Sequence, residues 1–184
     1  MDEIVKAALL KWPKVPHCHG WLALDARGQW FMRDERIQAA GPFPKVKGSR
    51  VDHIKLLEFI GRNYSHDELG AWFFQNGPQR VYVELEAAPW VWRIHRSEGG
   101  EGGQGGVELQ SHTGQAARLR PDGGVYLDDS GRLFLHTDIG LGIVHSLDME
   151  AAADEVASGR WQPVEMRWAD MPQRFGYRLK PEPA

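Results

Sequence analysis

The sequence of 184 residues has little of what marks a disulfide scaffold or a membrane protein. Cys18 is its only cysteine, so an internal disulfide is impossible, which is typical of a reducing compartment. No stretch approaches the roughly 18 apolar residues of a membrane-spanning helix. The acidic start, MDEIVKAALLKW, lacks the basic and apolar regions of a signal peptide. We therefore expect a cytoplasmic protein that does not bind a membrane.

An excess of positive charge is also missing. Residues 1–115 carry 14 Lys/Arg and 14 Asp/Glu, and residues 116–184 carry 8 and 11, which gives the formal net charge of −3. Binding to a phosphate polymer requires a clustered excess of cations. We therefore expect no polymeric nucleic acid among the partners, whereas a pocket for one small anion stays compatible with the composition.

Two stretches of the chain resemble each other. LDARGQWFMRDE (24–35) and LDDSGRLFLHTD (127–138) align without a gap. Each pattern predicts a strand, a tight turn and a second strand, with the glycine supplying the positive φ and the aspartate bonding the turn backbone. The same type of hairpin is therefore expected twice.

A helix and a further hairpin follow each of these stretches. In the first copy, Ser49 and Asp52 form a capping signal before RVDHIKLLEFIGRN, and AWFFQ and RVYVELE flank the hairpin signal Asn76-Gly77. In the second copy, DMEAAADEVAS is followed by QPVEMRW and FGYRLK. The pattern predicts a duplication of a β-β-α-β-β unit.

The fold class expected from these elements is α+β. The helix at 50–62 has apolar residues around most of its circumference, so antiparallel sheets are expected to pack around it as a central helix. The first repeat, residues 1–115, includes an N-terminal helix and a Gly-rich loop at 97–106, and the second repeat covers residues 116–184. The six glycines of SEGGEGGQGG predict a flexible loop.

His17-Cys18-His19 is the clearest candidate for metal or thiol chemistry. Alternate residues of a strand share a face, so His17 and His19 could both reach one metal ion while Cys18 points away. No Cys-x-x-Cys, His-Glu-x-x-His or Gly-x-Ser-x-Gly motif completes such a site. We therefore expect a partly exposed strand start, no bound metal and no cofactor. An enzyme that uses these three residues is the alternative.

Aromatic and cationic residues alternate along the predicted strands. The candidate ligand-binding residues are Trp30 and Trp92 as stacking surfaces and Arg33, Arg80 and Arg93 as anion contacts. Guanidinium groups bind phosphate through two hydrogen bonds, and aromatic rings stack on bases. Tryptophans that only fill a core are the competing interpretation of the same residues.

The segments ARGQWFMRDERI, DHIKLLEFIGRNY and GAWFFQNGPQRVYVELEAAPWV resemble an uncharacterised group of proteobacterial proteins of similar length. The matching positions are Gly28, Trp30, Phe31, Val83, Glu84, Leu85, Glu86, Ala88 and Pro89. This resemblance implies a duplicated α+β core and a second half that resembles a pleckstrin-homology-like barrel. It also implies a nucleotide-like ligand between the halves and a role in signalling.

Together these observations predict a non-enzymatic regulatory or signalling module that binds a small, nucleotide-like anion between two lobes. Two alternatives remain at this point. One is the metal- or thiol-dependent enzyme that uses His17, Cys18 and His19, and the other is a protein-protein interaction module.

Overall fold

The computed structural model describes residues 1–96, 106–121 and 123–183, and the chain forms two compact units. Unit 1 consists of Met1–Ala87 and Gly176–Ala184, and unit 2 of Ala88–Phe175. This division follows Ala87, whereas the repeat pattern placed a boundary after residue 115. Most of the expected Gly-rich loop, residues 97–105, lies outside the described residues. The fold is α+β, as expected.

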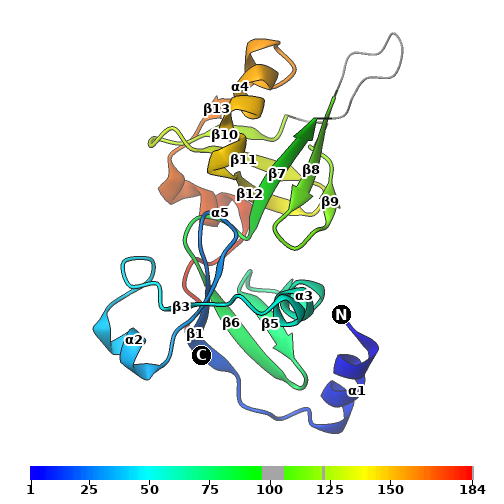
Figure 1. Cartoon of the computed structure of the whole chain (residues 1–184), viewed down its shortest axis with the longest axis vertical. Coiled ribbons are helices and arrows are strands. Elements are labelled where there is room, and N and C mark those ends of the chain that lie inside the picture. Colours follow the sequence, from blue (N-terminus) through cyan, green and yellow to red (C-terminus); the bar gives the residue numbers. More distant parts are fainter. Residues whose placement is uncertain (97–105, 122, 184) are drawn as a thin grey trace. The chain divides into compact units, whose positions relative to one another are not determined.

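Unit 1 is built on a mixed sheet (Figure 1). Its described strands follow the order β3-β2-β1-β6-β5-β4. Its strands are β1 (Cys18–Leu24), β2 (Trp30–Met32), β3 (Ser49–Arg50), β4 (Tyr64–His66), β5 (Trp72–Asn76) and β6 (Gln79–Leu85). β1 pairs antiparallel with β2 but parallel with β6. The sheet is therefore mixed, whereas the repeat pattern had predicted antiparallel sheets.

Unit 1 also contains the helices α1 (Glu3–Lys11), α2 (Glu35–Ala40) and α3 (Ile54–Arg62). α3 begins later than the Ser49/Asp52 capping signal suggested. His53 is the N-cap, and its Nδ1 accepts a hydrogen bond from the backbone N–H of Leu56 at 3.3 Å. Ser49 instead lies in β3, and Asp52 forms an ion pair with Arg50 at 2.6 Å. A side chain with an acceptor atom satisfies the first turn in either case.

The expected central helix is not found in unit 1. α3 contacts β5 on one face of the sheet, with the rings of Phe59 and Phe74 at 5.4 Å, edge to face. Ile60 is only 2% exposed, whereas Ile54, at the start of the helix, is 71% exposed. Part of the wide apolar surface predicted for the helix, at Ile54, is therefore exposed among the described residues of this unit.

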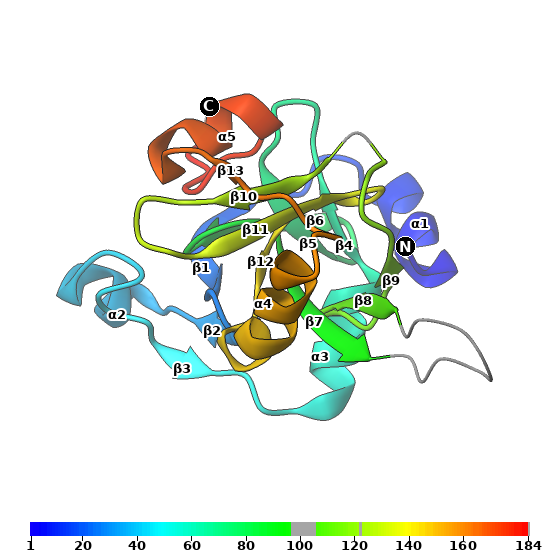
Figure 2. The same ribbon diagram turned by 90° about the horizontal axis from the view of Figure 1, so that it is seen from above.

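Unit 2 contains a longer sheet, in which the described strands follow the order β13-β10-β11-β12-β7-β8-β9. Its strands are β7 (Trp90–Arg96), β8 (Val107–Ser111), β9 (Ala116–Ala117), β10 (Val125–Leu127), β11 (Leu133–Thr137), β12 (Gly140–Val144) and β13 (Val164–Glu165). α4 (Met149–Ala157) contacts β7 (Figure 2). Its other helices are α5 (Met171–Phe175) and the 3-10 turns Ser146–Asp148 and Trp168–Asp170. Both sheets are open as far as the described residues show.

The last hairpin of the expected second repeat does not form. β13 pairs parallel with β10, and residues 171–175 are helical. The segment FGYRLK forms no strand, and its backbone hydrogen bonds go to unit 1. Arg178 N–H donates to the Gly70 carbonyl at 3.0 Å, and Leu85 N–H donates to the Leu179 carbonyl at 2.8 Å. Alternation in sequence predicts an extended segment, but it does not identify the strand with which that segment pairs.

No helix within the described ranges combines the length and the apolar character that crossing a membrane requires.

Candidate functional site

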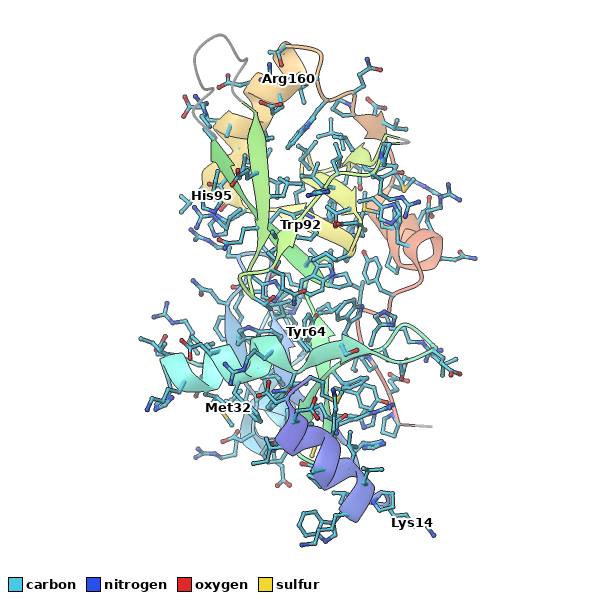
Figure 3. All side chains as sticks on the ribbon, turned by 90° about the vertical axis from the view of Figure 1, so that its right-hand side faces the viewer. Lys14, Met32, Tyr64, Trp92, His95 and Arg160 are labelled. Carbon is cyan, nitrogen blue, oxygen red and sulfur yellow. The ribbon has the colours of Figure 1, made fainter. Side chains whose placement is uncertain are left out.

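Both tryptophans expected to stack on a ligand are core residues. Trp30 is 3% exposed, and its ring lies edge-on to that of Tyr64 at 5.2 Å in unit 1. Trp92 is completely buried in unit 2 (Figure 3), and its Nε1 donates to the Leu135 carbonyl at 3.0 Å. In this conformation neither ring offers a face to a ligand.

Two of the three expected anion contacts are held by carboxylates. Arg33 is 2% exposed, pairs with Glu84 and donates from Nη2 to the Gly41 carbonyl at 2.7 Å. Arg93 donates to both oxygens of Asp148, from Nε at 2.6 Å and from Nη2 at 3.1 Å. An added anion would have to displace these carboxylates. We therefore assign both arginines to the support of the fold.

The pair formed by Arg93 and Asp148 shows how strongly such an arginine is engaged. Burial disfavours the charged carboxylate, but hydrogen bonds from Arg93 and from the Ile94 backbone N–H, at 3.1 Å, outweigh it. The pKa of Asp148 therefore lies below its ordinary value. The hydrogen bond to Asp148 in turn raises the pKa of Arg93.

Arg80 is the remaining predicted contact, and its environment differs. Its guanidinium carbon lies 4.4 Å from the centre of the Phe73 ring, as in a cation–π contact. Among the described residues no carboxylate lies within ion-pair distance of Arg80. Its guanidinium therefore has no counterion in the part of the chain that the structure describes.

Arg80 belongs to a group on one face of the unit 1 sheet that we call the histidine–arginine cluster. Its members are His17, His19, Phe73, Arg80 and Tyr82. The ring of His19 stacks on Tyr82 at 4.5 Å with an angle of 14°, and His17 stands edge-on to Tyr82 at 6.0 Å. The rings of Phe73 and Tyr82 meet at 5.8 Å beneath the polar groups. Tyr82 and Phe73 are buried, while His17 is exposed and His19 and Arg80 are half-buried.

The charges around the cluster change with pH. Burial, followed by the proximity of His17, lowers the pKa of His19 from its ordinary value of 6.5. One carboxylate, Asp67, lies beside the cluster and accepts the Tyr82 hydroxyl at 3.1 Å. Its other oxygen accepts the backbone N–H groups of Leu69 and Ala71 at 3.0 and 2.9 Å. At neutral pH Arg80 is thus a permanent cation beside an uncharged His19.

Cys18 lies on the other face of the sheet from its two histidine neighbours. It lines an apolar groove together with Leu22 and Phe74, whereas His17 and His19 contact Tyr82. In the described part of the chain, no three His, Cys, Asp or Glu side chains come close enough to hold a metal ion. The thiol and the imidazoles are therefore not assembled as nucleophile and base.

Unit 2 has a hollow of about 830 Å³ beside β8 and β9. Its lining includes His95 and Arg118, but also the carboxylates of Glu108 and Asp138. The negative groups oppose the binding of an anion there. This hollow also contains none of the ligand residues predicted from the sequence.

Phe73 and Tyr82 were missed as site residues. The signal was present for Tyr82, because Arg80 and Tyr82 are two residues apart in RVYVELE and must share a face of β6. Phe73 lies opposite Tyr82 on β5, and this register follows from the pairing of the two strands around Asn76-Gly77. The position of β1 beside β6 is a tertiary fact that no local pattern predicts.

Comparisons with known proteins identify a family but no activity. No curated protein matches the sequence. The fold resembles a crystal structure of a DUF1285 family protein from Silicibacter pomeroyi, with a TM-score of 0.53, 12% identity and 84% of each chain covered. A DUF1285 family protein from Shewanella baltica matches with a TM-score of 0.47 and 14% identity, over 73% of this chain and 91% of the other. A family model matches residues 1–182. The chain belongs to that family, DUF2944, described as "Protein of unknown function (DUF2946)".

Proposed function

We propose that this protein is a non-enzymatic module that binds a small, planar, nucleotide-like anion at the histidine–arginine cluster, and that it acts in regulation or signalling. The observation that carries the proposal is the state of Arg80. Its guanidinium carbon lies 4.4 Å from the centre of the Phe73 ring, on the face of the sheet that also carries His17 and His19, and among the described residues it has no carboxylate partner. An arginine oriented by an aromatic ring keeps the edge of its guanidinium available for a phosphate or carboxylate.

The remaining groups of the cluster suit the same ligand. The His19 ring stacks on Tyr82 with one face, so its other face is directed away from the tyrosine and can receive a planar ring. His17 is exposed and accepts the Arg80 backbone N–H at Nδ1, at 3.4 Å, which leaves Nε2 as a donor. The ligand would meet one permanent cation, two imidazoles and one stacking surface.

The arrangement favours binding over catalysis. A nucleophile needs a neighbouring base and an orienting group. Cys18 faces the opposite side of the sheet from His17 and His19. The oxygens of Asp67 already accept hydrogen bonds from the loop backbone and from Tyr82. Cys18 is a free thiol, as a reducing cytoplasm would keep it.

A nucleotide titration tests this function. We expect purine nucleotides to raise the thermal stability, by about 2.7 kcal/mol at one hundred times the dissociation constant. Arg80→Gln should abolish this effect. Arg50→Gln is the matched control, since Arg50 already pairs with Asp52 at the surface of the same sheet. The proposal would be rejected if nucleotides stabilised both variants equally. It would also be rejected if no nucleotide stabilised the native protein.

The pH dependence of the same titration is a second test. A bound anion favours the protonated imidazole, so the affinity should rise as the pH falls, and the lowered pKa of His19 places this rise on the acidic side of neutrality. His19→Phe keeps a ring against Tyr82 and should reduce this dependence. Calorimetric titrations at pH 5.5 and 8 provide the comparison, and an unchanged pH dependence in the variant would exclude His19 as a contact.

We further infer that the two units arose by duplication, with a pleckstrin-homology-like second unit. The similar hairpins support this weakly, because the same turn occurs elsewhere in the chain. The strand order supports it better. β3-β2-β1-β6 and β12-β11-β10-β13 both contain an antiparallel meander whose first strand pairs parallel with a later one. A bridge between Leu119 and Thr137 supports a curved sheet in unit 2.

A further inference from the structure

An apolar groove of about 270 Å³ lies on the face of the unit 1 sheet opposite the histidine–arginine cluster. Its floor is formed by sheet residues, including Leu22, Phe74 and Val81. Leu56 of α3 lines one side, and Trp21 and Met32 line another. Trp21 is 40% exposed and Met32 is 51% exposed, so large apolar side chains of the lining remain accessible to solvent.

The groove has identifiable structural causes. The pairing of β1 with β6 shifts register between Cys18 and Leu22, and Gly20 within this bulge has a φ of 78°. Bulges re-aim side chains, and this one leaves Trp21 half-exposed beside an otherwise regular strand. On the other side, α3 is buried at Ile60 but not at its first turn. The groove lies between this part of α3, at Leu56 and Ile60, and the sheet residues Leu22, Phe74 and Val81.

The lining of the groove is neutral. Cys18 is the one ionisable side chain among the described residues that line it, and the polar lining residues are the amides Asn76 and Gln79. Gln79 donates from Nε2 to the Pro16 carbonyl at 2.9 Å, so part of its capacity is already used. A charged ligand would lose hydration there without gaining a counterion. An apolar molecule with one polar group would lose little hydration free energy there, and its polar group could reach Asn76.

We propose that this groove binds a neutral aromatic molecule of about two fused rings. The volume sets the size, since an apolar cavity of about 150 Å³ takes up benzene and this groove is nearly twice as large. The flat shape follows from the position of the indole of Trp21 at the border, where it can stack on a ring. This site is independent of the proposed anion site, because the two lie on opposite faces of the sheet.

The probe for this proposal is 2-naphthol, with 2-naphthoate as its charged analogue. Both are titrated into the full-length protein, and the Met32 methyl signal is followed by NMR. We expect saturable binding of 2-naphthol that shifts the Met32 signal. The naphthoate should bind at least about tenfold more weakly, since burying its carboxylate without a partner costs more than the 1.4 kcal/mol that tenfold represents. Equal binding of the two probes would overturn the assignment.

Two variants of α3 provide matched controls. Leu56→Gln places a polar group in the lining and should weaken 2-naphthol binding about tenfold. Ile54→Gln makes the same change two residues away, where the side chain is 71% exposed and does not line the groove. It should bind like the native protein. If Leu56→Gln and Ile54→Gln bind 2-naphthol with the same affinity, the groove is not the site. Arg80→Gln, on the opposite face of the sheet, should leave the affinity for 2-naphthol unchanged.

Cys18 gives a readout that does not depend on the variants. Because its thiol lines the groove, saturating 2-naphthol should slow its alkylation by iodoacetamide by about tenfold, through occupancy of the site. An unchanged alkylation rate would contradict the proposal. A second copy of the chain is the competing occupant. Dimerisation that Trp21→Ser abolishes, together with the absence of 2-naphthol binding, would replace a small-molecule site by a self-association surface.

Discussion

At the scale of single residues, glycine makes room for tryptophan in unit 2. A Cβ atom on Gly142 would lie 2.4 Å from Nε1 of Trp92 and 2.7 Å from Cβ of Trp90. On Gly140 it would lie 3.2 Å from Nε1 of Trp90. The rings therefore cross β12 where it has no side chains, and Trp90 can donate to the Ile139 carbonyl at 2.9 Å. The Gly-x-Gly of this strand is thus explained by packing.

Gly142→Ala should consequently destabilise unit 2 by about 2 to 3 kcal/mol, because overfilling a packed core forces side chains or backbone to move. Gly114→Ala is the control. Its Cβ would meet nothing within 4 Å, so only the positive φ of 85° opposes the alanine, at about 1 kcal/mol. Urea unfolding followed by tryptophan fluorescence measures both. A Gly142 variant as stable as the Gly114 variant would show that the rings shift freely.

The buried pair of Arg33 and Glu84 is the second feature at this scale. Glu84 is the partner of the completely buried Ala23 across β1 and β6, and Arg33 follows β2 on the other side of β1, with its N–H donating to the Trp21 carbonyl at 2.9 Å. Their side chains therefore meet across β1. Arg33 also reaches the Gly41 carbonyl in the segment after α2. The pair therefore joins strands of the sheet to that segment.

Replacing one partner of this pair should lower the free energy of unfolding more than replacing both partners. Arg33→Met or Glu84→Leu alone leaves an uncompensated buried charge and should cost about 3 to 5 kcal/mol. The double variant should be more stable than either single variant, since no charge remains unpaired. A double-mutant cycle from denaturant unfolding measures the coupling. Additive losses would mean that water reaches the remaining charge.

Among the secondary-structure elements, the same type of turn joins the two strands in each of four hairpins. The loops 25–29, 67–71, 111–115 and 128–132 each begin with Asp or Ser and have glycine as the fourth residue. In each loop the first side chain accepts the backbone N–H groups of the third and fifth residues. Each glycine has a φ between 75° and 85°. The design is local, and its repetition is therefore weak evidence of common origin.

Asp67 allows the contribution of the turn to be measured. Asp67→Ala removes the acceptor for the Leu69 and Ala71 N–H groups and for the Tyr82 hydroxyl, and should destabilise unit 1 by about 1.5 to 3 kcal/mol. Asp67→Asn keeps an acceptor oxygen for the loop and should cost less than about 1 kcal/mol. Thermal unfolding compares the two, and similar losses would show that the negative charge, and not the turn geometry, stabilises this loop.

Asp148 connects two elements of unit 2, since it lies at the start of α4 and binds Arg93 and the Ile94 N–H of β7. Its pKa in the folded protein is below the ordinary 3.8. The unfolded chain therefore takes up the proton first, and the stability contributed by the carboxylate is present above pH 3.8 and lost as the pH falls toward the folded pKa. Acid unfolding should reveal this loss.

Asp148→Asn is the variant that tests this pH dependence. At pH 7 it should be less stable by about 2 kcal/mol, because Arg93 is 43% exposed and solvent screens part of the interaction. The difference from the native protein should shrink below pH 3.8. Urea unfolding at pH 7 and pH 3 provides both values, and a difference that is independent of pH would assign the effect to geometry alone.

At the scale of the whole molecule, unit 1 is discontinuous. Its last segment, residues 176–184, follows unit 2 in the chain but bonds to unit 1. The Tyr177 hydroxyl donates to the Ala87 carbonyl at 2.9 Å, and Arg178 and Leu179 bond to the backbone of Gly70 and Leu85. Tyr177 is 5% exposed. Residues 177–179 are therefore a structural part of unit 1.

Deleting residues 176–184 should accordingly weaken unit 1 and leave unit 2 intact. Amide hydrogen exchange is the suitable measurement, because it reports the opening of each strand separately. We expect faster exchange in β6, where the Leu85 N–H loses its partner, and unchanged exchange in β11 and β12. Uniform acceleration in both sheets would show that the units unfold as one, and no change would show that the segment contributes little.

Several parts of the fold could be predicted because they depend on neighbouring residues alone. The hairpins at 24–35 and 127–138 formed, with Asp25 and Asp128 bonding the turns and Gly28 and Gly131 at a φ of 75°. The alternation of His17, Cys18 and His19 across β1 was also predictable, since it follows from strand geometry. The start of α3 was placed too early because an imidazole took the capping role.

The candidate site could be predicted only in part, and the arginines show why. Arg33, Arg80 and Arg93 occur in similar alternating contexts of sequence. In the fold, Arg33 meets Glu84, which is 51 residues away, and Arg93 meets Asp148, which is 55 residues away. Arg80 meets no carboxylate among the described residues. The availability of a cation depends on such distant partners, which no local pattern contains.

The local geometry of this protein follows from its sequence, because turns, caps and strand alternation depend on residues within about five positions of one another. Contacts between distant segments, in contrast, place β1 parallel to β6, join residues 177–179 to unit 1 and bury Trp30 and Trp92 in the core. The physical reason is that burial and pairing are properties of contacts between distant segments, and their free energy is shared across the whole fold.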